Sequence, residues 1–295
     1  TPETDDHKTQ AAVQSILNDI EKRKEEALKE LNKKFDKYEG EVIVSKEKIE
    51  EAIKKVDQKT KDDVQFAHER IKKFAEHQLK SMNNNFEVEL SKGLFAGQRL
   101  VPVNTAGCYI PGGRYAHISS ATMAITPAKV AGVKTIICAS PPKDKNGAHP
   151  GIIYAANLCG ADVILNLGGI AAIGSMAYGC FGNPPVDFLV GAGNQYVSEA
   201  KRIVYGQVGI DQFAGPTEIA VIADKSADKE IVAVIGDLSQ LLSGAKLIGI
   251  PITCPGEITI FCGEFIVQPF GIPDTEMSTT AMSFPELTSH AVGIP

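Results

Sequence analysis

The residues best placed for chemistry form the turn Gly191-Ala192-Gly193-Asn194, which joins an apolar run at residues 186–190 to a helical pattern. Because glycine has no Cβ atom, backbone at such a turn can approach a ligand closely, and the N–H groups of a helix start favour an anion. The pattern therefore favours an anionic ligand such as a cofactor pyrophosphate. It does not complete the dinucleotide fingerprint, and glycines at such turns often serve only to turn the chain.

Two more glycine-containing turns are candidate ligand sites of the same kind, Tyr109 to Gly113 and Gly168-Gly169. The predicted strands cover residues 134–139, 161–167, 186–190 and 219–223, and predicted helices such as 150–158 separate them. Strands and helices in alternation are typical of parallel βαβ units, whose ligands bind at the carboxyl ends of the strands. The sequence therefore predicts an α/β fold in which the three turns lie at those ends.

The first 80 residues are highly charged, and their apolar residues recur at helical spacing. They predict amphipathic helices over residues 10–38, after the N-cap candidate Ser45, and around Val64 to Phe74. The charged faces could form a coiled coil, but solvated faces of scaffold helices are the better interpretation. The pairs His68-Glu69 and Glu76-His77 are expected at the surface, since acid–base chemistry needs a concave site. Residues 86–90 and 97–103 predict strands.

The composition excludes several classes of protein. The chain has 295 residues, enough for about two domains, with 43% hydrophobic residues and a net charge of −6. No basic field attracts nucleic acid or an anionic membrane. The six cysteines show no Cys-x-x-Cys pair, so they are expected as buried thiols in a reducing compartment. No signal peptide and no membrane-spanning window are visible, which predicts a cytoplasmic protein.

With these turns identified, the order of the motifs resembles the histidinol dehydrogenase family from about residue 10 to residue 240. Each motif alone is weak, whereas five in one order are specific. They are Tyr109-Ile110-Pro111-Gly112-Gly113, Thr126-Pro127-Ala128-Lys129-Val130-Ala131-Gly132, Gly168-Gly169 with Ala177-Tyr178-Gly179, Gly193-Asn194-Gln195-Tyr196-Val197 to Arg202, and Gly209-Ile210-Asp211 to Glu218.

The resemblance implies an α/β fold with two Rossmann-like lobes, each with a parallel sheet, preceded by the N-terminal amphipathic helices. The expected division is residues 1–108 as the helices and the first part of lobe 1, 109–217 as the inserted lobe 2, and 218–295 as the return to lobe 1. The implied activity is an NAD-dependent oxidation of a primary alcohol to a carboxylate in two hydride transfers. The implied assembly is a homodimer.

The same resemblance assigns candidate site residues. Tyr109, Gly193 and Asn194 line the cofactor site, and Thr217 stands where a substrate-contacting serine is usual. Gln240 stands at the position of a zinc ligand that also contacts substrate. The stretch Gly112 to Ile118 is similar to the sulfopropanediol dehydrogenase branch, in which Arg114 and His117 would bind a sulfonate. Alternatively, Arg114 binds a cofactor phosphate or pairs with an acidic neighbour.

The chain also departs from the family pattern. Ala171 replaces a glutamine that contacts NAD, and Ser243 replaces a zinc histidine. After Gln240 no family motif follows, so Gln240 is only a residual ligand, zinc is not expected to be held, and no catalytic residue is assigned. The segment after Gln240 is either a divergent tail or the product of a truncation or frame change. Two functions remain open: an alcohol dehydrogenase, for histidinol or a sulfonated diol, and a catalytically incomplete nucleotide-binding or scaffolding paralogue.

Overall fold

The computed structural model describes residues 2–82, 85–113, 115–212, 219–223, 247–251, 259–262 and 266–269, with side chains from residue 7 to residue 212. The chain divides into two compact units, Thr1–Ala214 and Gly215–Pro295. The first unit contains most of the predicted site residues. Among its described helices, none combines the length and the apolar character that a bilayer crossing requires.

The first unit is built on a five-stranded sheet with the order β5-β4-β3-β6-β7. All four neighbouring strand pairs are parallel. The strands are β3 (Thr105–Tyr109), β4 (Thr135–Ser140), β5 (Val163–Asn166), β6 (Phe188–Val190) and β7 (Gly209–Ile210). Numbered along the chain, this order is that of a Rossmann half, with the third strand at one edge and the first strand in the centre.

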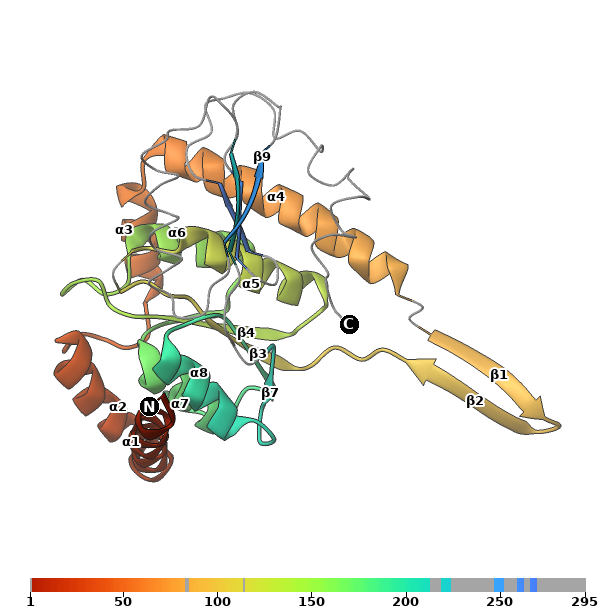
Figure 1. The fold of residues 1–295 in the computed structure, drawn as a ribbon, viewed down its shortest axis with the longest axis horizontal. Helices are drawn as coiled ribbons and strands as arrows, with labels where there is room; N and C mark the ends of the chain where they lie inside the picture. The colour runs from red at the N-terminus through yellow and green to blue at the C-terminus, as the bar shows by residue number, and fades with distance from the viewer. Residues whose placement is uncertain are drawn as a thin grey trace. The chain divides into compact units, whose positions relative to one another are not determined.

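Helices cover both faces of this sheet (Figure 1). One face carries α1 (Pro2–Arg23), α7 (Gly169–Tyr178) and α8 (Gln195–Val204), and the other carries α3 (Lys46–Lys55), α4 (Gln58–Ser81), α5 (Ile118–Val130) and α6 (Pro150–Cys159). Successive side chains of β4 point to opposite faces of the sheet, and each face has its own hydrophobic core. Ile137 and Ala139 face the first set of helices, whereas Ile136 and Cys138 face the second. The predicted α/β class with a parallel sheet is thus confirmed.

The N-terminal helix is broken, contrary to the continuous helix predicted over residues 10–38. Lys24 lies between α1 and α2 (Glu25–Leu31) with a φ of 51°, and a π-helical segment, η1 (Asn32–Asp36), follows. The break turns the chain back along the sheet, so that Leu17 and Leu28 enter the same core. Amphipathic spacing does not reveal this break, because the apolar stripe continues through it.

A buried asparagine, Asn166, anchors the N-terminal segment to the end of β5. The Asn32 Nδ2 donates to the Asn166 carbonyl over 2.9 Å, and the Asn166 Nδ2 donates to the Tyr38 hydroxyl over 3.2 Å. The Asn166 backbone N–H donates to the carbonyl of Val42, and an antiparallel bridge joins Ile43 to Leu165. These contacts fix residues 32–43 against the edge strand of the sheet.

A hairpin of β1 (Asn85–Ser91) and β2 (Leu94–Arg99) precedes the sheet, as the alternation at residues 86–90 and 97–103 predicted in part. Every residue of both strands is exposed, including Phe86 and Phe95.

In the second unit, the described strands form a sheet with the order β11-β10-β8-β9. Its strands are β8 (Ile219–Ala223), β9 (Leu247–Pro251), β10 (Thr259–Cys262) and β11 (Ile266–Pro269). The pair β8–β9 is parallel, and β10 pairs antiparallel with β8 and β11.

The predicted division at residues 108 and 217 stays a prediction. In the described part of the chain, the N-terminal helices pack on the five-stranded sheet and share its two cores.

The cysteines at positions 108, 138, 159 and 180 are free and buried, as predicted. The surface position predicted for His68 is wrong: this side chain is half-buried, and its Nδ1 lies 3.0 Å from the Thr126 hydroxyl. His77 is exposed, as predicted.

Candidate functional site

The candidate site lies at the carboxyl edge of the five-stranded sheet, where the chain connections diverge. From the central strand β3 the chain crosses through α5 to β4 on one side, whereas β6 lies on the other side. Such a topological switch point is where doubly wound sheets bind their ligands. The two connections that meet there are Tyr109 to His117, after β3, and Gly191 to Asn194, after β6. Two of the predicted glycine turns are therefore neighbours in space.

The turn after β6 depends on Gly191. Its φ is +129°, and an added Cβ would lie 2.1 Å from the carbonyl oxygen of Tyr109, so only glycine fits. Gly193 is required for another reason, because a Cβ there would lie 2.6 Å from the Cβ of Val197 on α8. Packing of the chain itself therefore explains both glycines, and it brings the end of β6 against the end of β3.

An ion pair between a buried lysine and a partly exposed aspartate holds the same turn. The ammonium group of Lys201 donates to the carbonyl of Gly191 over 2.9 Å and also to the carboxylate of Asp211. The other oxygen of Asp211 accepts from the Gly191 N–H over 2.9 Å. The Lys201 side chain is only 6% exposed, whereas that of Asp211 is 24% exposed, so the ammonium group is buried beneath the site and the carboxylate lies at its rim. The sequence reasoning missed both roles, although both residues fall within the motifs that carried the family resemblance.

Asn194 begins helix α8. Its side-chain oxygen accepts from the N–H groups of Tyr196 and Val197, each over 3.1 Å, which satisfies two donors of the helix start. Asn194 is exposed, and its Nδ2 amino group has no hydrogen-bond acceptor among the described residues. That amino group is therefore available to a ligand at the sheet edge.

Tyr109, the last residue of β3, is buried, and burial raises the pKa of its hydroxyl. The Tyr109 hydroxyl accepts from the N–H of Gly169 over 3.3 Å, which links the end of β3 to the start of α7. The third predicted turn, Gly168-Gly169, therefore also lies at this edge. Sequence reasoning placed Tyr109 in the cofactor site, and the structure places it at the switch point.

The remaining predicted site residues have different positions. His117 is the N-cap residue of α5, half-buried, and its N–H donates to the carbonyl of Pro111 over 3.2 Å. It lies at the same edge as Tyr109. Arg114, Thr217 and Gln240 lie outside the described residues. Ala171, at the position of a family glutamine, is buried in α7 with 7% exposure and presents only a methyl group.

The backbone at this edge leaves open space at two of the glycine turns. Added Cβ atoms at Gly113 and Gly169 would meet no atom within 4 Å, so both turns leave open space beside the backbone. The starts of α7 and α8 lie at this edge, so the positive ends of both helix dipoles favour an anion there. Tyr109, Gly193 and Asn194 would hold such a group. For zinc, the described residues contain no cluster of three His, Cys, Asp or Glu side chains, and the candidate ligand Gln240 is not among them.

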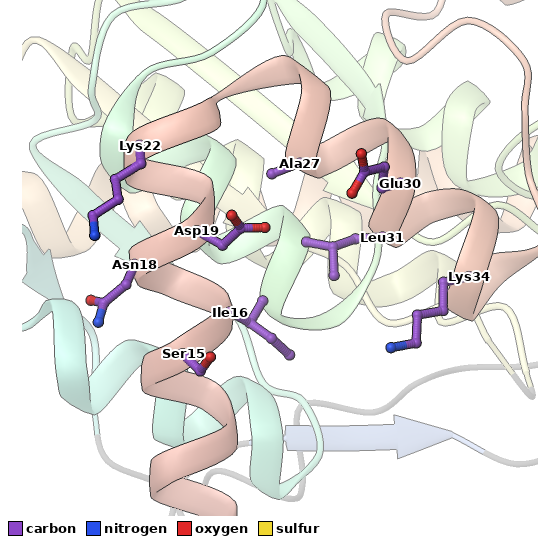
Figure 2. A pocket seen from close by; sticks show the side chains of 9 residues that line it. All are labelled: Ser15, Ile16, Asn18, Asp19, Lys22, Ala27, Glu30, Leu31 and Lys34. Atoms are coloured by element: carbon purple, nitrogen blue, oxygen red, sulfur yellow. The ribbon is translucent and has the colours of Figure 1, made fainter.

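A separate pocket of about 560 Å³ lies between α1 and the segment formed by α2 and η1 (Figure 2). It is lined by Ser15, Ile16, Asn18, Asp19, Lys22, Ala27, Glu30, Leu31 and Lys34. Its two carboxylates, Asp19 and Glu30, both pair with Arg23. Both carboxylates are thus already engaged within the protein, and no predicted site residue is among the lining residues.

Comparisons with known proteins agree with this arrangement. The family model described as histidinol dehydrogenase matches residues 1–244. A histidinol dehydrogenase homolog of Pelagibacter ubique is 67% identical over 234 residues, which cover 79% of this chain and 55% of that protein. A sulfopropanediol 3-dehydrogenase of Ruegeria pomeroyi is 48% identical over 232 residues, which cover 79% of this chain and 53% of that protein.

The crystal structure of histidinol dehydrogenase from Elizabethkingia anophelis superposes with a TM-score of 0.70 and 35% identity, covering 82% of this chain and 56% of the other. The chain thus spans about half the length of the curated relatives that it matches. The family match ends at residue 244, shortly after Gln240, where the sequence motifs also stop. Fold, motif order and family match agree over residues 1–244, and the chain therefore belongs to the histidinol dehydrogenase family.

Proposed function

We propose that the protein is an NAD-dependent dehydrogenase that oxidises a primary alcohol to a carboxylate in two successive steps. The observation that supports this most is the family match over residues 1–244, because it includes the sheet edge where the neighbouring strands β3 and β6 end and where Tyr109 and Asn194 lie. When bound, NAD accepts one hydride in each step. The chain's own residues supply position: the turn at Gly191 and the capped start of α8 hold the cofactor beside the substrate.

For the substrate, the candidates are histidinol and a sulfonated diol. The sulfonated diol is supported by Arg114 and His117, which follow the glycine turn after β3. A guanidinium group offers paired donors to a fixed oxyanion, and the half-buried start of α5 adds a favourable helix terminus. The relative described as sulfopropanediol 3-dehydrogenase supports the same choice. The homodimer implied by the family is part of this proposal.

The competing function is a catalytically incomplete paralogue that binds the nucleotide without turnover. Two substitutions favour it: Ser243 at the position of the family's zinc histidine, and Ala171 at that of a glutamine that contacts NAD. Ala171 is buried in α7 and cannot replace an amide. Under this alternative the sheet edge remains a nucleotide site.

The test uses the purified chain. NAD binding is measured by calorimetry, and NADH formation is followed with histidinol and with 2,3-dihydroxypropane-1-sulfonate, each with and without zinc. NADH formation with either alcohol supports the dehydrogenase and identifies its substrate. Binding of NAD without turnover supports the incomplete paralogue. A chain that binds no NAD contradicts both, because both place the nucleotide at the sheet edge.

A further inference from the structure

The Asp36 carboxylate is a charge that the proposed cofactor contacts leave unused. Asp36 ends η1, and its Oδ2 lies 3.3 Å from the position that a Cβ on Gly168 would occupy. The Cβ of Pro141, just after β4, lies 2.7 Å from the same position. The carboxylate is therefore held at the carboxyl ends of two adjacent strands, β4 and β5, beside the switch point.

The fold fixes Asp36 at this position from both sides along the chain. Asn32, four residues earlier, and Tyr38, two residues later, both hydrogen-bond with Asn166 at the end of β5. Asn32 and Tyr38 are 1% and 5% exposed, so these contacts are shielded from water. A carboxylate carried by a mobile segment could move into solvent, whereas this one is fixed at the edge of the sheet.

The carboxylate has no partner in the described part of the chain: no hydrogen-bond donor and no cation lies against it. Burial raises the pKa of Asp36, and its charge contributes to raising the pKa of Tyr109. A partly buried charge without a partner lowers the stability of the folded state. A charged group that lowers stability and lies at the edge where ligands bind is typical of a residue that interacts with a ligand.

The position identifies the ligand group. In doubly wound sheets, a carboxylate after the second strand accepts hydrogen bonds from the adenosine ribose of NAD, and its charge repels the 2′-phosphate of NADP. Here the second strand is β4, and the residues that follow it are Pro141 and Pro142, which have no polar side chain. Asp36 and Pro141 both lie beside the same point next to Gly168, so the Asp36 carboxylate is the polar group that the described residues place at the end of this strand.

We propose that the Asp36 carboxylate accepts hydrogen bonds from the adenosine ribose hydroxyl groups of NAD and excludes NADP. The inference rests on the proposed function, since it deepens the same cofactor site. A structural explanation competes with it. Gly168, the N-cap residue of α7, has no side chain to satisfy the helix start, so a nearby negative charge could instead stabilise that helix. The two explanations predict opposite effects when the charge is removed.

The experiment compares the wild-type chain with Asp36→Asn by titration with NAD and with NADP. Glu39→Gln is the matched control, because Glu39 is an exposed carboxylate of the same segment that pairs with Lys33. Asn194→Ala reports on the cofactor site independently. We expect wild type to prefer NAD, and Asp36→Asn to bind NAD about tenfold more weakly, the usual loss for a hydrogen bond to a charged group. NADP binding should be unchanged or stronger, and the melting temperature unchanged or higher.

An unchanged ratio of NAD to NADP affinity in Asp36→Asn would overturn the inference, especially with a lowered melting temperature, which is the result that helix stabilisation predicts. If Asn194→Ala still weakens NAD binding in that case, the proposed cofactor site stands and only the role of Asp36 fails. A wild-type chain that binds neither nucleotide would overturn the proposed function and this inference together.

Discussion

The buried ammonium group of Lys201 and the partly exposed carboxylate of Asp211 form an ion pair that closes around the backbone of Gly191. The Lys201 ammonium donates to the Gly191 carbonyl, and Asp211 accepts from the Gly191 N–H, so one residue's two polar backbone groups are satisfied by opposite charges. The pair joins α8 to the chain just after β7. It therefore fixes the turn of the candidate cofactor site to two elements of the core at once.

Replacing Lys201 with methionine should destabilise the protein strongly. Methionine fills the space but leaves the Asp211 carboxylate and the Gly191 carbonyl without their donor. Leaving these groups without a donor costs about 1–3 kcal/mol in free energy of unfolding. Urea denaturation measures the loss. Lys129→Met is the matched control, because Lys129 is half-exposed and lies 4.0 Å from Asp162, and its loss should be under about 1 kcal/mol. Equal effects in both variants would contradict the structural role of the buried pair.

Gly191→Ala should be far more harmful than Gly113→Ala. At Gly191 the left-handed φ costs about 1–3 kcal/mol for alanine, and the added Cβ also collides with the Tyr109 carbonyl oxygen. At Gly113 the same methyl group meets no atom within 4 Å. Thermal unfolding of the two variants gives the comparison. If Gly191→Ala unfolds at the wild-type temperature, the turn does not have the described backbone geometry.

Asn194 has two roles that different substitutions separate. Asn194→Ala removes the cap of α8 and the free amino group, so it should lower the free energy of unfolding by about 1 kcal/mol and weaken NAD binding. Asn194→Asp retains the capping oxygen but introduces a negative charge beside the anionic cofactor. It should therefore keep wild-type stability while weakening NAD binding. Unaltered NAD affinity in both variants would remove Asn194 from the cofactor site.

The elements with strong local signals were predictable from the sequence. Ser45 and Asn194 were identified as helix-start residues by type and position, and both accept hydrogen bonds from the first turn of their helix. The central strand β3 was missed, because Thr105-Ala106-Gly107-Cys108-Tyr109 has small residues and no alternation. Its burial depends on partners from β4 and β6, which a local pattern does not contain. Helix α5 was missed as well, because Pro127 interrupts its pattern.

The site could be predicted only as far as local turns allow. Asn194 follows the predicted strand at residues 186–190, so the βα rule places it at the carboxyl edge, whereas Tyr109 was placed there through its glycine turn without its own strand being predicted. Asp36 comes from a segment more than a hundred residues before the Gly168 turn, and long-range contacts such as the hydrogen bonds of Asn166 bring the two together. Lys201 is a charged residue of the amphipathic helix α8, a type that is usually exposed. Its side chain is buried because Asp211 lies beside it in the fold. Helical spacing alone contains no information about such a partner from another segment.

Cys159 lies 3.4 Å from the Nδ1 of His68, but the pair should be chemically inert. Burial raises the pKa of the Cys159 thiol to about 11 and lowers the pKa of His68, so both groups are neutral near pH 7. At pH 8 about one molecule in a thousand would carry the thiolate. Iodoacetamide labelling, read by peptide mass spectrometry, should therefore be slow at Cys159 in the native protein and fast in urea. Rapid native labelling would contradict the buried position of this thiol.

The stability of Asp36→Asn relative to wild type should depend on pH. Burial raises the pKa of Asp36 in the folded chain above its value in the unfolded chain, so folding opposes ionisation of this carboxyl group. The contribution of Asp36 to stability is therefore fully present below the unfolded pKa and is lost as the pH rises through the folded pKa. Asparagine does not titrate. The variant should melt close to the wild-type temperature at about pH 3 and above it at about pH 7, with the difference developing between these values.

Melting curves across this range, with Glu39→Gln as the exposed control, measure the effect. A variant that is less stable than wild type at neutral pH would mean that the negative charge stabilises the start of α7, and the carboxylate would then have a structural reason to lie at the sheet edge.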